Sequence, residues 1–198
     1  MKTLSKIAAL GLTVSVLAIA GSANAAVAGA TGTINVTGSV GPKCMVSPSA
    51  ASTFSGTLAF GELSTNSAGT LSPSVVSSSV SFEVLCNTST PTVTISATPM
   101  TAQNNPTTAA GYSSTVDYTA EAAVQKATSG SATFSFKTAD LSSLSNEPST
   151  GPVGDRLKAT AQNLTVTASS LTTRGGADQV LVADTAYAGV ITVTVSPS

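Results

Sequence analysis

Near its C-terminus the chain reads Ile191-Thr192-Val193-Thr194-Val195, with apolar and hydroxyl side chains at alternate positions. Successive side chains of a β-strand point to opposite faces, so this period of two predicts a strand with one apolar and one polar face. Val, Ile and Thr are all β-branched and fit such a surface well. We therefore expect this stretch to lie in a sheet, with its Ile and Val side chains directed at a core.

The same alternation recurs along the chain and is interrupted by clusters of Gly, Pro, Asn and Ser. The expected strands are residues 33–37, 58–61, 80–84, 91–97, 116–124, 132–136, 164–168, 180–182 and 188–195. Residues 104–111 and 141–154 read as loops, and 120–127 could alternatively form a short helix. Many short strands at near-regular spacing predict an all-β sandwich. The expected core residues are Phe60, Phe82, Val84, Val93, Ile95, Phe134, Phe136, Leu164, Val166, Ile191 and Val193.

The first 25 residues have the layout of a secretory signal peptide. Lys2 and Lys6 precede an apolar run at 7–20, and Ala23-Asn24-Ala25 supplies a small-residue cleavage pattern. The apolar run is short for a membrane span, although a retained N-terminal anchor is the alternative. The pattern predicts export, with cleavage before Ala26.

Charge is scarce, and histidine is absent. The chain has 8 basic and 9 acidic residues, and charged residues make up 9% of it. A chain with this balance of charges has no positive electrostatic field that would attract nucleic acid or anionic lipid. Without His, the commonest general base and metal ligand is missing, and the carboxylates are too scattered for a calcium site. A Ser–Lys pair stays open, but we expect a protein that is not an enzyme and that has no metal or cofactor.

Cys44 and Cys86 are the two cysteines of the chain. An even number of cysteines in an exported protein predicts a disulfide. Closing the loop between them should stabilise the fold by roughly 3–4 kcal/mol on the loop-entropy account. A redox or metal role is the alternative, for which no third Cys or His is present to complete a site.

Four features, in order, carry a resemblance to a known family. They are the segment Gly32-Thr33-Ile34-Asn35-Val36-Thr37-Gly38-Ser39-Val40, the cysteine pair, the element Leu58-Ala59-Phe60-Gly61, and the ending Tyr187-Ala188-Gly189-Val190-Ile191-Thr192-Val193-Thr194-Val195. Together they resemble chaperone–usher pilins, most of all the spore-coat-protein-U-like domain of archaic chaperone–usher pili. The chain departs from many such pilins in ending Val195-Ser196-Pro197-Ser198, without a nearby aromatic residue.

The resemblance implies a fold and a mode of assembly. Such pilins have an immunoglobulin-like β-sandwich that lacks its last strand. A periplasmic chaperone fills the groove, and at the outer-membrane usher the N-terminal extension of a neighbouring subunit replaces it. On this reading residues 26–40 are the donor strand and 41–198 the sandwich domain. The protein would be a structural subunit of a bacterial surface pilus or fimbria, supporting adhesion to host or abiotic surfaces or biofilm formation.

Under this interpretation, individual residues can be assigned to the donor strand and to the wall of the groove. The apolar face of the donor strand consists of Ala30, Gly32, Ile34, Val36, Gly38 and Val40, preceded by Ala28. Ile34 and Val36 are the expected anchors, and burying each should contribute roughly 1.5–3 kcal/mol. No charged residue occurs from 26 to 42, as a buried strand requires. In similar pilins the terminal strand borders the missing one, which makes Val190, Ile191, Val193 and Val195 the expected groove wall.

Other classes of function remain open at this point. A self-complete secreted β-sandwich that binds a glycan or host surface would use residues 31–40 as its own first strand. The chain has no Trp and 3 Tyr, so aromatic platforms for sugars are sparse. A tip adhesin and an envelope or spore-coat protein are further alternatives, because a fold does not settle a function.

Overall fold

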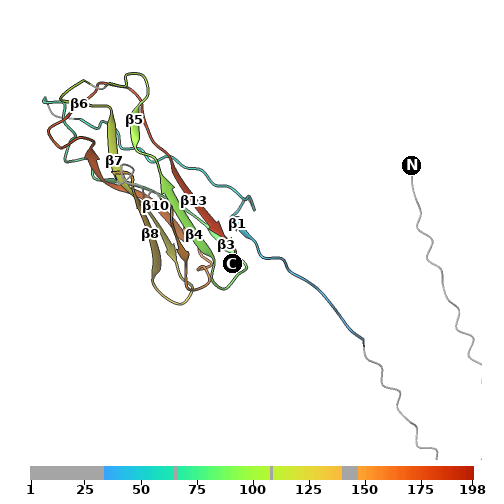
Figure 1. Cartoon of the computed structure of the whole chain (residues 1–198). Helices are drawn as coiled ribbons and strands as arrows, with labels where there is room; N and C mark the ends of the chain where they lie inside the picture. The colour runs from blue at the N-terminus through green and yellow to red at the C-terminus, as the bar shows by residue number, and fades with distance from the viewer. Residues whose placement is uncertain (1–33, 65–66, 108, 140–146) are drawn as a thin grey trace, which may run out of the picture. The chain divides into compact units, whose positions relative to one another are not determined.

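The computed structural model describes residues 34–64, 67–107, 109–139 and 147–198. The chain has two compact units, residues 1–39 and residues 40–198. The second unit is all-β, with almost no helix and with its sheets in a sandwich-like arrangement (Figure 1). The fold class predicted from the sequence is confirmed at this level.

The larger sheet has the strand order β12-β5-β7-β10-β2, and β8 pairs with β7 farther along the edge that β5 also uses, opposite β10. All its pairings are antiparallel. The long strand β7 thus organises the sheet, because three strands pair along its length. The strands are β2 (Ser77–Phe82), β5 (Met100–Ala102), β7 (Thr115–Gln125), β8 (Ser131–Lys137), β10 (Leu164–Thr173) and β12 (Tyr187–Ala188).

The second sheet has the order β13-β4-β9, and β4 packs against β7 and β8 of the larger sheet. Two short ladders complete the unit: β1 pairs with β3, and β6 pairs with β11 in parallel. Figure 1 shows β5 and β6 at one end of the domain and β1, β3 and the C-terminus at the other. The strands are β1 (Cys44–Val46), β3 (Val84–Cys86), β4 (Thr92–Ala97), β6 (Tyr112–Ser113), β9 (Ser149–Pro152), β11 (Val180–Leu181) and β13 (Ile191–Ser196).

The core lies between the two sheets. Val93 and Ile95 of β4 are fully buried against Val116 and Val124 of β7 and Leu164 of β10, all at 0% exposure. Of the predicted core residues, six are buried: Val84, Val93, Ile95, Phe134, Leu164 and Val166. The other five are only half-buried: Phe60, Phe82, Phe136, Ile191 and Val193.

Several sequence-based expectations need correction. The expected loop at 141–154 contains β9, which pairs with β4, and the helix considered at 120–127 is the end of β7. Residues 58–61 form no strand, and they end at Gly61, whose φ of 69° suits a glycine. Residues 34–37, expected in a strand, have no strand partner among the described residues.

A buried charge fixes the end of the larger sheet. The Asp117 side chain, 4% exposed, accepts hydrogen bonds from Arg174 Nε at 3.0 Å and from Thr138 Oγ1 at 3.0 Å. Arg174 Nη2 also donates to Asp117 Oδ1 at 2.5 Å, which makes the two side chains an ion pair. Because Arg174 lies in the turn after β10, the pair ties this turn to β7.

Candidate functional site

The strand β13 has an open edge. Its register with β4 runs from Ile191↔Ala97 to Ser196↔Thr92, and no other described strand pairs with it. Thr98 N–H donates to Val190 O at 2.8 Å, so the backbone groups at even positions point toward β4. In an antiparallel ladder the backbone groups of the intervening residues point the other way. The N–H and C=O groups of Ile191, Val193 and Val195 are therefore directed at the open edge.

A second stretch of unpaired backbone faces this edge. We call residues 52–60, which follow β1, the connecting segment. Within the described part of the chain, these residues make no backbone hydrogen bond. Side chains hold the segment in place: the Phe54 ring packs on the Phe82 ring at a centroid distance of 4.6 Å. At Gly56 a Cβ would lie 3.0 Å from both Val80 Cγ2 and Phe82 Cζ, so this part of the segment lies tight against β2.

A groove separates β13 from the connecting segment. Its middle hollow has a volume of about 500 Å³ and an apolar floor that belongs to the larger sheet. The floor and walls include four of the five half-buried core residues: Phe60, Phe82, Ile191 and Val193. Solvent reaches these side chains from the groove, which explains why the predicted core is incompletely buried on this side.

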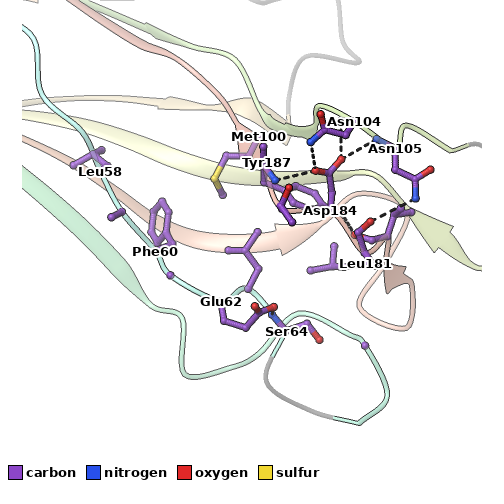
Figure 2. A pocket seen from close by; sticks show the side chains of 18 of the residues that line it. Leu58, Phe60, Glu62, Ser64, Met100, Asn104, Asn105, Leu181, Asp184 and Tyr187 are labelled. Carbon is purple, nitrogen blue, oxygen red and sulfur yellow. Dashed lines mark hydrogen bonds between the residues drawn. The ribbon is translucent and has the colours of Figure 1, made fainter.

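Two further hollows extend the groove. A lower hollow of about 230 Å³ lies between β1 and the end of β13, and it shares Phe54 and Val193 with the middle hollow. An upper hollow of about 1100 Å³ shares Phe60 and Tyr187 with the middle hollow (Figure 2). The three hollows therefore form one track. Along β13 and β12, from Val195 to Tyr187, this track is roughly 27 Å long at 3.4 Å per residue.

Close contacts join the floor of the groove to the strand segments beside it. The Tyr118 hydroxyl donates to Thr98 O at 2.8 Å, and burial raises the pKa of Tyr118 to about 12. Gly189 lies between β12 and β13, where a Cβ would come within 2.8 Å of Thr98 O and 2.9 Å of Pro99 O. The chain can approach Thr98 and Pro99 this closely only because residue 189 has no side chain.

The charge in the groove is confined to one end. The middle and lower hollows have no charged lining residue, whereas Glu62 and Asp184 line the upper hollow. The Asp184 carboxylate accepts hydrogen bonds from the N–H groups of Ala186, Asn104 and Asn105, and from Asn104 Nδ2 (Figure 2). These bonds, led by that from Ala186 and partly opposed by desolvation, lower its pKa to about 2. Asp184 is therefore ionised at neutral pH.

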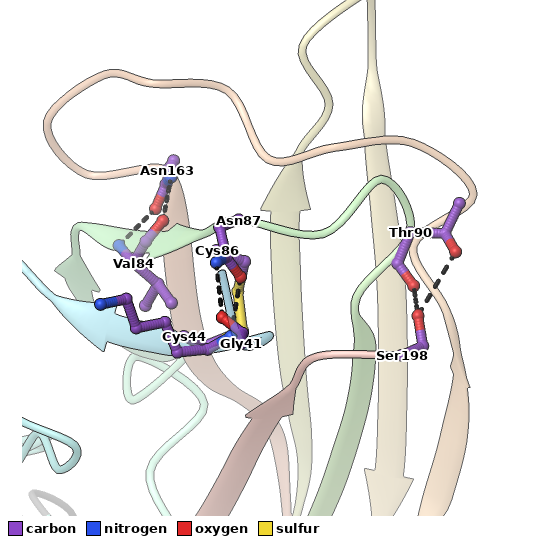
Figure 3. Close-up of a disulfide and its surroundings, with 9 residues drawn as sticks. Gly41, Cys44, Val84, Cys86, Asn87, Thr90, Asn163 and Ser198 are labelled. Carbon is purple, nitrogen blue, oxygen red and sulfur yellow. Dashed lines mark hydrogen bonds between the residues drawn. A yellow bond between two sulfur atoms is a disulfide. The ribbon is translucent and has the colours of Figure 1, made fainter. Parts of the chain in front are cut away.

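The predicted disulfide between Cys44 and Cys86 is present. It joins the first residue of β1 to the last residue of β3, where the two strands pair (Figure 3). Asn87 prolongs this ladder: Lys43 N–H donates to Asn87 Oδ1 at 2.7 Å, and Asn87 Nδ2 donates to Gly41 O at 2.9 Å. The chain is thus fixed where residues 41–43 enter the domain.

Another asparagine supports the same region from the interior. Asn163 is fully buried, and its side chain bonds to both Val84 N and Val84 O at 2.8 Å. These two bonds replace the backbone bonds of a strand partner at the break between β2, which ends at Phe82, and β3, which begins at Val84. The structural roles of Asn87 and Asn163 were missed from the sequence, where both stand in Asn-x-Ser/Thr patterns that are frequent in a chain rich in Ser and Thr.

The predicted donor residues divide between described and undescribed parts of the chain. Ala30 and Gly32, like the predicted signal peptide at 1–25, lie outside the described residues. Ile34, Val36 and Val40 are 88%, 91% and 82% exposed. Apart from Gly38 itself and its two chain neighbours, no described atom lies within 4 Å of where a Gly38 Cβ would be. This apolar face therefore has no partner among the described residues.

The predicted groove wall falls on the open edge. Val190, Ile191 and Val193 line the middle hollow, and Val193 and Val195 line the lower one. No sequence signal marked Tyr118 or Gly56 as groove residues, because an inward position on a strand does not reveal which part of the core it meets. Ser55 and Thr57 were equally unmarked, although both line the middle hollow.

Other kinds of site find little support in the described residues. No three His, Cys, Asp or Glu side chains there are grouped so that they could hold a metal ion. None of the helices described is both long and apolar enough to cross a bilayer. What the described residues do offer is a long groove with unpaired backbone on both walls and no charged lining residue in its lower and middle hollows.

Comparison of the chain with protein-family models, curated protein sequences and solved structures finds no match.

Proposed function

We propose that this protein is a structural subunit of a surface fibre, in which the N-terminal extension of one copy fills the groove of the next. The observation that carries the proposal is that one chain has both an unfilled strand site and an unpartnered strand-like segment. The site has unpaired backbone at β13 and at the connecting segment, and the segment exposes Ile34 and Val36. An added strand would satisfy the backbone and bury the apolar side chains together.

The strand arrangement supports an incomplete immunoglobulin-like sandwich. In that fold one layer has the order A-B-E-D, and the other pairs C with F and F with G. Here β1 pairs with β3, the continuation of β2, and β2, β10 and β7 follow in that order, while β4 pairs with β13. In this proposal β13 would correspond to strand F, and the groove beside it to the place of strand G. The resemblance to chaperone–usher pilins noted in the sequence is the second support.

The proposal includes partners and a location. A subunit with an open groove exposes apolar surface and unpaired strand edges, which favour aggregation. It would therefore need a periplasmic chaperone that occupies the groove and an outer-membrane usher at which the chaperone is replaced. The finished polymer would be a fimbria on the cell surface, contributing to adhesion or biofilm formation.

The proposal is tested by the heat sensitivity of the polymer. Protein extracted from the cell surface is run on denaturing gels with and without boiling, comparing wild type with the variant Ile34→Asp plus Val36→Asp. Strand-exchanged polymers often resist detergent until heated, because each junction hides a paired strand. We expect a heat-sensitive ladder from the wild type and its loss in the variant, with folded subunit remaining in the periplasm.

Asn35→Asp plus Thr37→Asp is the matched control. It adds the same two charges to the opposite face of the segment, where an inserted strand would face solvent. The control should keep its ladder. A single soluble, folded monomer band from wild type and both variants would reject strand exchange and favour a self-complete secreted module.

A further inference from the structure

The donor segment and the groove have matching charge patterns. No charged residue occurs from 26 to 42, and Lys43 is the first charge after this stretch. Likewise, the groove is uncharged through its lower and middle hollows and ends at Glu62 and Asp184 in the upper hollow. An uncharged strand followed by a cation thus corresponds to an uncharged groove that ends in two carboxylates.

Lys43 is available for such a pairing. It is exposed, and the one ion pair within the described residues joins Arg174 to Asp117. Its backbone N–H and C=O bond to Asn87, which fixes the position of the residue while leaving the ammonium group free. On the groove side, Glu62 is exposed and its Oε1 accepts only a long bond of 3.4 Å from Ser64 N–H. Neither charge is therefore neutralised by an ion pair within the described part of its own chain.

The geometry gives the pairing a direction. Lys43 follows Val40 by three residues, a reach of roughly 10 Å along the chain. If an inserted strand runs antiparallel to β13, its C-terminal end lies at the upper hollow, and Lys43 arrives near Glu62 and Asp184. If it runs parallel, its end lies at the lower hollow, which has no carboxylate lining and is bordered by Cys44. There the incoming Lys43 would approach the acceptor's own Lys43.

Arg156 is a further basic residue near the lower end, where Glu83, the residue before Val84, is the acidic one. Arg156 lines a small hollow together with Asn87, the residue that holds Lys43. Lys126 forms an isolated backbone β-bridge with Leu157, and Lys158 N–H donates to Gln125 O. Asp155, hydrogen-bonded to Thr128, is an acidic group in the same cluster of loops. Insertion in the parallel direction would thus place like charges together, which disfavours it.

We propose that Lys43 of one copy pairs with the Glu62 and Asp184 carboxylates at the upper end of the groove in the next copy. The inference rests on the proposed strand exchange and adds to it a specificity contact between copies. The contact sets the direction and the register of the inserted strand. Like other exposed charge pairs across an interface, it acts mainly on the rate and orientation of association.

Charge reversal tests the pairing. Full-length mature chains are assembled in vitro, and the rate at which the detergent-resistant ladder forms is measured at low and high ionic strength. At low ionic strength we expect Lys43→Glu and Glu62→Lys each to slow assembly about ten-fold, with the difference shrinking as salt screens the charges. The double variant Lys43→Glu plus Glu62→Lys should recover much of the rate, although Asp184 then opposes the new glutamate.

Lys137→Glu is the matched control, because it makes the same charge change at an exposed position of β8 that lines none of the three hollows. It should assemble at the wild-type rate. The pairing is overturned if Lys43→Glu is no slower than Lys137→Glu, or if the double variant is no faster than the single ones. A ladder that is lost in Ile34→Asp plus Val36→Asp but insensitive to these reversals would overturn the pairing and leave strand exchange intact. A wild type that forms no ladder would overturn both.

A second measurement does not depend on rates. Zero-length cross-linking of fibres made from isotopically light and heavy chains should join Lys43 of one copy to Glu62 or Asp184 of another. Cross-links from Lys43 only to a carboxylate near the lower hollow, such as that of Glu83, which precedes the lining residue Val84, would show the opposite strand direction and would contradict the inference.

Discussion

The paired strands β4 and β13 have almost the same sequence pattern and very different surroundings. β4 reads TVTISA and β13 reads ITVTVS, so each alternates apolar and hydroxyl side chains. In β4 the inward residues Val93 and Ile95 are 0% exposed, whereas the inward Ile191, Val193 and Val195 of β13 are half-buried. The difference lies in their neighbours: β4 has β13 on one side and β9 on the other, while β13 has β4 alone.

This contrast shows what a period of two can specify. Alternation assigns each side chain to a face, because successive residues of a strand point in opposite directions. It does not specify whether the edge of the strand is closed, because that depends on a partner elsewhere in the chain or in another chain. β13 therefore has the sequence of a core strand, although a described strand pairs with only one of its two edges.

The largest difference is expected when the same side chain is truncated in both strands. Val93 and Val195 are directly opposite each other in the register. In a non-polymerising background, Val93→Ala should lower the free energy of unfolding by about 2–3 kcal/mol, because a cavity opens in a closed core. Val195→Ala should cost less than about 1 kcal/mol, because solvent already reaches this side chain. Urea unfolding measures both values.

The comparison becomes sharper in the polymer. Once a strand fills the groove, Val195 should behave as a core residue, and the two truncations should destabilise the assembled fibre to a similar extent. Equal costs in the monomer, by contrast, would mean that the edge of β13 is already closed within one chain.

A smaller effect is expected from pH. The folded-state pKa of Asp184 is lowered from 3.8 to about 2, so its hydrogen bonds stabilise the fold fully above about pH 4 and less as the pH falls toward 2. The lower and middle hollows carry no ionisable acid or base in the neutral range, so the Val93–Val195 difference should not change between about pH 5 and 8. Asp184→Asn should shift the urea midpoint at pH 5 and have progressively less effect as the pH is lowered to 2. A constant shift across this range would contradict the assigned hydrogen bonds.

Much of the fold could be predicted from the sequence, for physical reasons that are local. Strands such as β4, β7 and β8 were found because their apolar residues alternate over six or more positions. The strand β9 was missed because Ser149-Thr150-Gly151-Pro152 has no apolar alternation; it is held by backbone pairing with β4. A Cβ on Gly151 would lie 3.1 Å from Phe134 Cε1, so the glycine lets the ring pack closely against β9. The short strands β1, β5 and β6 were missed because a strand of two or three residues is too short to show the alternation of apolar and polar side chains.

The candidate site was only partly accessible from the sequence. The wall residues Ile191 and Val193 follow from the alternation and from the resemblance to pilins. The opposite wall could not be predicted, because the connecting segment uses no regular pairing and is held by contacts such as that between Phe54 and Phe82. The acidic upper end was missed as well, since Glu62 and Asp184 are far apart in sequence and line the same hollow only because of the fold.

Hydrogen exchange at β13 tests the central claim most directly. The exchange rates of individual amides are compared between the wild-type fibre and the folded monomer of Ile34→Asp plus Val36→Asp. We predict that the amides of Ile191, Val193 and Val195 exchange rapidly in the monomer and on the order of 100-fold more slowly in the fibre, while those of Thr192 and Thr194, which bond to β4, are protected in both. Equal protection of all five amides in the monomer and the fibre would contradict an open edge that is filled by a neighbouring copy.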